Sequence, residues 1–419
     1  MNKKLIAIAV GSAIGALGTS AAFAQSSSVS LSGNLNFNYG FYDNGGAGFT
    51  KGSGDTVGVE KTKYDNLANQ ESNWRVTGEE KLANGMAAFF QCETSMDITG
   101  SGAANMCNRN SFIGMKGGFG SVNFGTYDTP AKRLSGMYDP FPISAAFGQG
   151  AQMFNATTTS GNSNASGNPI ASSSSSFSRR QNALITYDMP SMNGFDAAFA
   201  FSAANEGSGQ NSASTIQKPR MWSAMVNYTN GPLGLGLGYE NHHNYNPLNK
   251  LDGTTTNTNA AYTGGDDTML SLGAGYKVSD ALRLSAIWNS MKYDKINAAG
   301  QSLSAKTYGL YADWNFSGPY RVRAGYSVMQ STSGSYNGLA AATNLQLGVW
   351  TGNAGAGQTG SQKIHTELIN SLSKRTDVGL SYARIANDRF SAITIGTGGA
   401  NPNYGQTSTF MGMLIRHKF

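Results

Sequence analysis

The chain has few charged residues and no long apolar run. Only 13% of its 419 residues are charged, whereas soluble domains average about 25%. No segment reaches the roughly 20 consecutive apolar residues that a membrane-spanning helix needs. Helix-favouring residues are scarce, while glycine, which disfavours helices, occurs 54 times. These shortages argue against a helical soluble domain and against a helical membrane protein.

The first 24 residues have the three parts of a secretory signal segment. Lys3 and Lys4 precede an apolar run over 5–17, and Ala22-Phe23-Ala24 forms a small-x-small cleavage site. The sequence therefore predicts export, with residues 1–24 as a signal peptide and residues 25–419 as one mature domain.

The chain has only two cysteines, Cys92 and Cys107, which flank a predicted hairpin loop over 93–106. Exported chains reach an oxidising compartment, where such a pair forms a disulfide. Closing a loop of about 15 residues contributes roughly 3 kcal/mol in the chain-entropy view. Two cysteines without a nearby histidine or further cysteine do not supply the four ligands of a structural metal site. We therefore predict a disulfide and no metal.

The net charge of +6 and the pI near 9.1 raise the question of an anionic partner. The lysines and arginines are dispersed singly along the chain and form no basic cluster. Together with export, this dispersion predicts no nucleic-acid partner.

The last thirteen residues alternate with the period of a β-strand. One face of this strand is mostly apolar, the other carries Arg416 and Lys418, and the chain stops at Phe419. Because an untied terminus normally frays, a strand that ends flush with an aromatic residue predicts that this terminus closes a barrel. A capped edge of a small sheet is the alternative reading of this segment.

The first mature segment, 29–41, also alternates, with an apolar face and a face of Ser, Asn and Gly. A soluble sandwich or a membrane barrel would fit this one strand. Many later strands place charges on the face opposite the apolar one, among them Arg283, Asp313 and Glu367. A packed sandwich core could not hold so many polar groups unpaired, whereas the lumen of a barrel could.

Short turns alternate with long polar loops along the chain. Seven short turns are predicted at 83–85, 117–120, 190–194, 230–232, 279–280, 317–319 and 373–375. Eight long loops are predicted at 43–69, 93–106, 128–178, 205–218, 244–266, 294–304, 331–360 and 387–406. Fifteen connections predict sixteen strands, and this pattern is typical of an all-β, antiparallel transmembrane β-barrel.

Four motifs resemble the general diffusion porins of betaproteobacteria. The longest, over 109–122, reads RNSFIGMKGGFGSV and is similar to the segment that precedes the third loop in that family. The others are GEEKLANG at 78–85, RQNALITY at 180–187 and the RHKF ending. With the signal segment, the resemblance spans the whole chain.

The resemblance implies a sixteen-stranded homotrimer in the outer membrane of a Gram-negative bacterium, with a third loop that folds into the lumen. That loop is residues 128–178 here, predicted as an ordered arm to about Gly150 followed by a mobile tip over 155–176. The implied function is passive diffusion of ions and small hydrophilic solutes, with no cofactor. The implied partners are outer-membrane lipid and lipopolysaccharide, and, for Phe419 as an assembly signal, periplasmic chaperones and the barrel-assembly machinery.

The sequence departs from the family in its second strand and after the glycine equivalent to Gly125. Asn73, Thr77 and Thr126 stand where the family usually has cations, and Arg75 lies between the first two with the same inward parity. The usual anion preference is therefore expected to be weak or nearly absent. The charged residues predicted at the constriction are Arg75, Asp128, Lys132, Arg133, Asp139, Arg180, Arg321 and Arg323.

Three other functions remain open to the sequence, one of which is a purely structural or adhesive barrel with a lumen plugged by loops. A channel specific for a sugar or an organic acid would explain the missing family cations. A barrel hydrolase would need a serine, a histidine and an acid, but the chain has four histidines and no Gly-x-Ser-x-Gly or His-Glu-x-x-His motif. We therefore predict no enzyme activity and no catalytic residue.

Overall fold

The computed structural model describes residues 27–45, 50–51, 55–56, 63–97, 99–100, 105–141, 177, 179–202, 220–245, 265–294, 302–334, 358–389, 391, 393, 395 and 405–419. The predicted signal peptide, residues 1–24, and the predicted loop tip, 155–176, lie outside the described residues. Among the described residues, no helix is both long and apolar enough to cross a bilayer.

Most elements are β-strands. The first nine are β1 (Ser27–Asp43), β2 (Thr50–Lys51), β3 (Asp55–Thr56), β4 (Lys63–Asn69), β5 (Asn73–Lys81), β6 (Ala87–Ser95), β7 (Ser111–Gly117), β8 (Gly120–Asp128) and β9 (Arg180–Asp188). The next five are β10 (Phe195–Ser202), β11 (Arg220–Asn230), β12 (Leu233–Tyr245), β13 (Gly265–Lys277) and β14 (Leu282–Tyr293). The last five are β15 (Leu303–Ser317), β16 (Tyr320–Met329), β17 (Ser361–Ser371), β18 (Thr376–Asn387) and β19 (Thr407–Lys418). The helical elements of the described chain are η1 (Ala83–Gly85) and α2 (Pro130–Tyr138).

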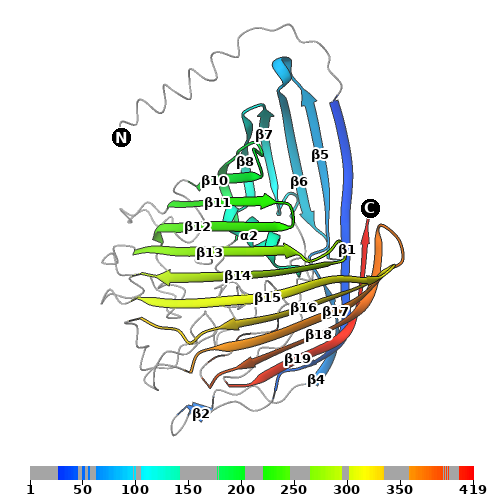
Figure 1. Ribbon diagram of the computed structural model, residues 1–419, viewed down its shortest axis with the longest axis vertical. Coiled ribbons are helices and arrows are strands. Elements are labelled where there is room, and N and C mark those ends of the chain that lie inside the picture. The colour runs from blue at the N-terminus through cyan, green and yellow to red at the C-terminus, as the bar shows by residue number, and fades with distance from the viewer. Residues whose placement is uncertain are drawn as a thin grey trace.

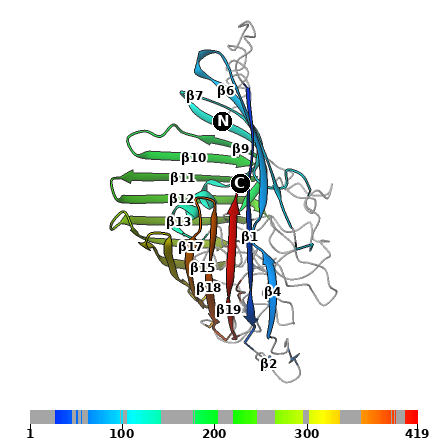
Figure 2. The ribbon, with the colours of Figure 1, turned by 90° about the vertical axis from the view of Figure 1, so that its right-hand side faces the viewer.

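The long strands form one antiparallel sheet that closes on itself. Each strand pairs with its neighbour along the chain, and β19 returns to pair with β1 from Asn34↔Lys418 to Asp43↔Thr409 (Figures 1 and 2). Gly33 and Phe419 exchange two backbone hydrogen bonds of 3.0 and 3.1 Å. The prediction that the C-terminal strand closes a barrel is confirmed.

The second barrel strand differs from its prediction, because it begins inside the expected loop 43–69. β4 pairs with residues 37–43 of β1 and β5 pairs with residues 27–34, so that the two form one barrel strand with an interruption at 70–72. At the interruption Glu71 has a positive φ of 56°, which takes the backbone out of the ladder. The Ser72 hydroxyl bonds to the backbone N and O of Asn36 at 2.9 and 3.2 Å, and thereby replaces the missing ladder bonds.

Counting β4 and β5 as one gives sixteen barrel strands in the described chain, as the sequence predicted. The seven short turns join β5–β6, β7–β8, β9–β10, β11–β12, β13–β14, β15–β16 and β17–β18, and the long loops leave the other ends of the strands. Both ends of the barrel circuit, the start of β1 and the end of β19, therefore lie with the short turns.

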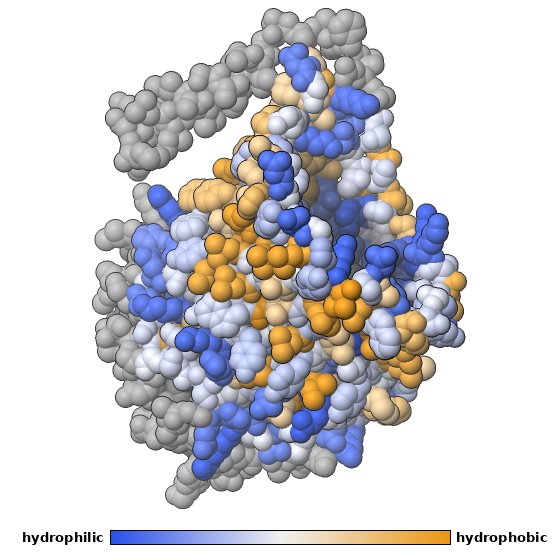
Figure 3. Space-filling view, in the orientation of Figure 1, coloured by the Kyte–Doolittle hydropathy of each residue, from blue (hydrophilic) through white to orange (hydrophobic). Residues whose placement is uncertain are grey.

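The two faces of the sheet differ as the alternation predicted. Outward apolar side chains such as Leu235, Leu310 and Met411 are 46–63% exposed. Figure 3 shows apolar side chains spread over the strands of one side of the barrel. Inward neighbours such as Ser271, Asn289 and Glu367 are polar and buried. An apolar outer surface and a polar inner face are what a bilayer around a lumen requires.

Candidate functional site

The helix α2 follows β8 because the sequence places helix-start signals there. The Thr129 side chain accepts a hydrogen bond from the Lys132 amide at 3.4 Å, and Pro130 occupies the first turn. Leu134 and Tyr138, four residues apart, lie on one face of the helix and are almost completely buried.

This helix lies against the inner face of the barrel wall (Figure 1). It contacts β11 where the Ala131 amide donates to the Ser223 hydroxyl at 3.1 Å. At the other end of α2, the Ser285 hydroxyl of β14 donates to the Tyr138 carbonyl at 2.6 Å, and the Arg283 guanidinium donates to the Met137 carbonyl at 2.7 Å. The helical part of the predicted third loop is therefore attached to the wall by its backbone as well as by its side chains.

Burial raises the pKa of the Tyr138 phenol, which stays a neutral hydrogen-bond donor. Its hydroxyl donates to the Asn227 side chain on β11 at 2.5 Å.

Beneath α2, the inward positions of the barrel wall are glycines. Gly236 and Gly238 of β12 and Gly273 of β13 face inward, because the leucines that alternate with them, such as Leu237 and Leu272, are exposed outward. Their lack of a side chain lets Leu134 and Tyr138 approach the sheet backbone. The alternating segment LGLGLG at 233–238 carries this signal in the sequence, but we did not predict the glycines as part of the site.

Charged inward residues gather on the opposite side of the lumen. This first charge cluster lies on β5, β6, β8, β9, α2 and the connection before β7, and consists of Arg75, Glu93, Arg109, Asp128, Lys132, Arg133, Arg180 and Asp188.

Within the first charge cluster, two carboxylates each form ion pairs with two cations. Glu93 lies 2.6 Å from Arg109 and 3.8 Å from Arg75. Asp128 lies 2.9 Å from Lys132 Nζ and 3.4 Å from Arg180 Nε.

The Arg133 guanidinium, carried by α2, reaches Asp188 on β9 at 2.6 Å and lies 5.4 Å from the Tyr127 ring centre. Arg75 keeps 42% of its side chain exposed, more than any other cation predicted at the constriction. It is therefore the predicted cation most accessible to a passing ion.

A second charge cluster lies on β15, β16 and β17. Arg321 forms a two-pronged ion pair with Asp313, and Arg323 lies 3.8 Å from Asp313 and 3.4 Å from Glu367. Asp139, which follows α2, accepts the Phe141 amide at 2.9 Å, and the Phe141 ring stacks on His365 of β17 with ring centres 4.0 Å apart.

The structure thus separates the predicted constriction residues into two groups. Arg75, Asp128, Lys132, Arg133 and Arg180 belong to the first charge cluster, Arg321 and Arg323 belong to the second, and Asp139 follows α2 and is counted in neither.

All six predicted cations pair with carboxylates. The predicted constriction set did not include the partners Glu93, Asp188, Asp313 and Glu367, although Asp313 and Glu367 were predicted to face inward. Strand register brings most of these pairs together, for example at Arg75↔Glu93, Asp313↔Arg323 and Arg323↔Glu367, whereas the docking of α2 brings Arg133 to Asp188.

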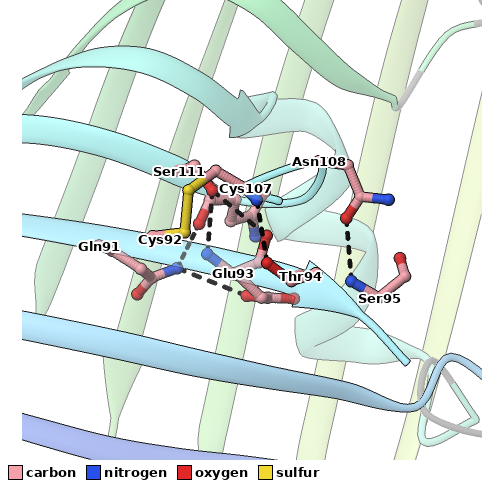
Figure 4. Close-up of a disulfide and its surroundings, with 9 residues drawn as sticks. Gln91, Cys92, Glu93, Thr94, Ser95, Cys107, Asn108 and Ser111 are labelled. Atoms are coloured by element: carbon pink, nitrogen blue, oxygen red, sulfur yellow. Dashed lines mark hydrogen bonds between the residues drawn. A yellow bond between two sulfur atoms is a disulfide. The ribbon is translucent and has the colours of Figure 1, made fainter. Parts of the chain in front are cut away.

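The predicted disulfide is confirmed, with the Cα atoms of Cys92 and Cys107 4.8 Å apart. Figure 4 shows it beside β6, where the Cys107 amide donates to the Thr94 hydroxyl at 2.9 Å. Two residues further on, the Arg109 amide bonds to the Glu93 carbonyl at 3.0 Å. The bridge therefore anchors the connection that carries Arg109 into the first charge cluster. Among the described residues, no three His, Cys, Asp or Glu side chains are grouped as a metal site needs.

A closed sixteen-stranded barrel with an apolar exterior and a charged interior defines an outer-membrane channel protein. The comparison with known families agrees, because the model of the Gram-negative porin family matches residues 9–389. The chain belongs to this family.

One curated porin is similar over the whole chain and another over about a third of it. The outer membrane porin protein 32 of Delftia acidovorans is 26% identical over 423 aligned positions, which cover 100% of both chains. The major outer membrane protein P.IA of Neisseria meningitidis serogroup A is 29% identical over 150 residues, 35% of this chain and 31% of that protein.

Solved structures share the fold. An anion-selective porin from Comamonas acidovorans superposes with a TM-score of 0.68 at 20% identity, covering 94% of this chain and 100% of that one. The OmpT protein of Vibrio cholerae in its trimer form gives a TM-score of 0.61 at 14% identity, with the same coverage. This chain is therefore an outer-membrane porin of a Gram-negative bacterium.

Proposed function

We propose that this porin is a passive channel for ions and small hydrophilic solutes with a weak preference for anions. The pairing of its lumen charges is the observation that carries this proposal. Each of the six cations predicted at the constriction has a carboxylate oxygen within 4 Å. A paired cation exerts little net field on a passing ion.

A small surplus of positive charge supports the sign of the preference. The first charge cluster holds five cations, Arg75, Arg109, Lys132, Arg133 and Arg180, against Glu93, Asp128, Asp188 and the neighbouring Glu71, which lies 3.7 Å from Arg109. The exposed Arg75 is where this surplus meets the lumen.

Sieving by size is the second part of the proposal. Because α2 occupies space inside the wall of β11–β14, it narrows the lumen between that wall and the first charge cluster. Solutes small enough to pass would cross beside α2, which covers the glycines of β12 and β13 and carries Lys132 and Arg133 of the first charge cluster.

The test is the zero-current potential of the purified protein in a planar bilayer under a salt gradient. The unaltered protein should give a small zero-current potential whose sign indicates a preference for anions. Arg75→Glu with Arg133→Glu should move the potential toward cations, since the two substitutions change the lumen charge by four units.

Arg384→Glu is the matched control, because this exposed side chain of β18 has the outward parity of Tyr382. An unchanged potential in the double variant would refute the assigned constriction. The absence of any conductance in the unaltered protein would refute the channel itself.

The assembly we propose is a homotrimer. The support is the family membership together with a structural relative that was solved as a trimer. Light scattering of the detergent-solubilised protein should give three chains per particle, and a monomeric mass would contradict the proposal.

We also propose that the outer face of the barrel contacts lipopolysaccharide. Arg220, Lys306 and Arg384 are exposed and share the outward parity of Trp222, Leu310 and Tyr382, within four residues of the long-loop ends of their strands. None of the three has an ion pair among the described residues. Arginine and lysine at this level suit phosphate groups of the surrounding glycolipid.

Changing all three to glutamine should weaken binding to vesicles that contain lipopolysaccharide more than binding to neutral vesicles. Equal losses in the two vesicle types would contradict a phosphate contact. Export by residues 1–24, and recognition of Phe419 by periplasmic chaperones and the barrel-assembly machinery, complete the proposed route to the membrane.

A further inference from the structure

We propose that the inward glycines Gly236 and Gly273 set the bore of the channel, because they determine how close α2 lies to the wall. This inference rests on the proposed channel function and names the residues that control its size limit.

The spacing between α2 and the wall leaves no room for one added methyl group at these two positions. A Cβ atom at Gly273 would lie 2.8 Å from Cγ of Tyr138 and closer still to the next ring atom. A Cβ atom at Gly236 would lie 2.6 Å from a methyl of Leu134 and 2.7 Å from the Tyr138 ring. Real Cβ atoms do not occupy such distances, so a neighbour must move.

The Tyr138 ring cannot turn aside without losing its partners. Its hydroxyl donates to Asn227, and this bond would break if the ring turned. The backbone carbonyl of Tyr138 accepts a bond from the Ser285 hydroxyl, which holds the residue itself in place. The Arg283 guanidinium, which bonds to the preceding carbonyl, lies 5.9 Å from the ring centre. The close contacts of Gly273 include Cγ at 2.8 Å besides the nearer ring atoms, and flipping the ring about the Cβ–Cγ bond leaves Cγ in place.

The wall behind the glycines is less free to move than the helix. β12 and β13 are paired with each other over Leu233–His243, and each is also paired along its other edge, to β11 and β14. Besides its contacts with this wall, α2 is held by the ion pairs of Lys132 with Asp128 and of Arg133 with Asp188, which constrain it less than sheet pairing constrains β12 and β13. An added methyl group at Gly273 should therefore push α2 toward the lumen axis and narrow the bore.

Gly234 provides a matched control on the same strand and the same face. A Cβ atom there would lie 3.6 Å from the Tyr138 hydroxyl oxygen and 3.9 Å from its ring, which are ordinary contact distances. Gly234→Ala has the same chemistry as Gly236→Ala and the same strand propensity change, but it does not press on α2.

The experiment measures single-channel conductance in planar bilayers for the unaltered protein, Gly234→Ala, Gly236→Ala and Gly273→Ala. The entry of neutral polyethylene glycols of graded size reports the bore of each variant independently of charge. We expect lower conductance and a smaller polymer limit for Gly273→Ala, a smaller decrease for Gly236→Ala, where a leucine methyl can yield, and no change for Gly234→Ala.

A double-variant cycle with Tyr138→Ala separates pressure on α2 from damage to the barrel. In the Tyr138→Ala background, Gly273→Ala should no longer lower the conductance, since the ring it presses on is absent. If Gly273→Ala does not fold, Gly236→Ala is compared in the same two backgrounds, and Tyr138→Ala should then remove only part of its effect because the Leu134 contact remains.

The outcomes distinguish the two levels of the proposal. The glycine inference alone would be overturned if the unaltered protein conducts normally and the conductance of Gly273→Ala equals or exceeds that of the unaltered protein. An equal loss with and without the Tyr138 ring would also overturn it, because the effect would then come from the wall. A silent unaltered protein would overturn the channel proposal and this inference together.

Discussion

The two sides of the lumen use opposite means to shape one passage. On the β5–β9 side, inward side chains are long and charged, and each carboxylate of the first charge cluster holds one or two cations. On the β12–β13 side, the inward positions under α2 are glycines. The first side can interact with ions through charge, while the glycines of the second side leave room for Leu134 and Tyr138 of α2.

The difference shows how a porin can separate selectivity from size exclusion. Ion pairs near water contribute little to folding but orient the charges that an ion meets. Close packing of α2 on the inward glycines contributes to stability and fixes the position of the helix. Substitutions on the two sides should therefore have different consequences, and four predictions test this.

The largest expected effect is a stability loss on the glycine side. Tyr138→Ala removes a buried ring and leaves the side-chain oxygen of Asn227 without its donor, so the free energy of unfolding should fall by about 3–5 kcal/mol. Arg75→Ala on the charged side should cost about 1 kcal/mol or less. Urea unfolding in lipid vesicles measures both values. Equal losses would remove the distinction between the two sides.

The disulfide gives the largest expected stability effect on the charged side. Cys92→Ser with Cys107→Ser should lower the free energy of unfolding by about 3 kcal/mol, because the connection over 93–106 gains freedom in the unfolded chain. Reduction of the unaltered protein, followed by the same unfolding measurement, is the control. The prediction fails if free-thiol reagents label the folded, unreduced protein.

A smaller effect concerns selectivity alone. Glu93→Gln removes the shared partner of Arg75 and Arg109, so the zero-current potential should shift toward anions. The shift should be about a quarter of that from Arg75→Glu with Arg133→Glu, since one charge unit changes instead of four. Glu80→Gln, on an exposed outward position of β5, is the control. A shift toward cations would contradict the assigned field.

The smallest effect is that of salt. The anion preference should decline as ionic strength rises, because the screening length falls from about 10 Å at 0.1 M to about 3 Å at 1 M. The polymer size limit should stay constant over the same range, since packing against glycine does not depend on charge. If the selectivity does not change with salt, the proposal fails, because ions would then contact the lumen charges directly, without the water that lets salt screen them.

Particular elements show how far prediction from sequence reached. Alternation of apolar and polar residues predicted the outward sets, the sixteen strands and the closing role of Phe419, because a bilayer and a lumen impose a period of two on every strand. It missed β4, since the positive φ at Glu71 and the Ser72 contacts with Asn36 interrupt a strand without ending it.

The candidate site was predicted only in part. The inward parity of Arg75, Arg321 and Arg323 followed from the alternation and the strand assignment. Their pairing with Glu93, Asp313 and Glu367 did not, because these carboxylates belong to neighbouring strands whose register is set by pairing across the sheet. The inward arm over 142–150 stays a prediction, as it lies outside the described residues.

The sequence by itself determined the class of this protein: an exported chain whose alternating strands need lipid on one side and polar surroundings on the other. Only the tertiary structure decided which charges neutralise one another and where α2 rests. The reason is physical, because periodicity is a local property of each strand, whereas the contacts of Glu93 with Arg109 and of Tyr138 with Gly273 join segments that meet only after the barrel has closed.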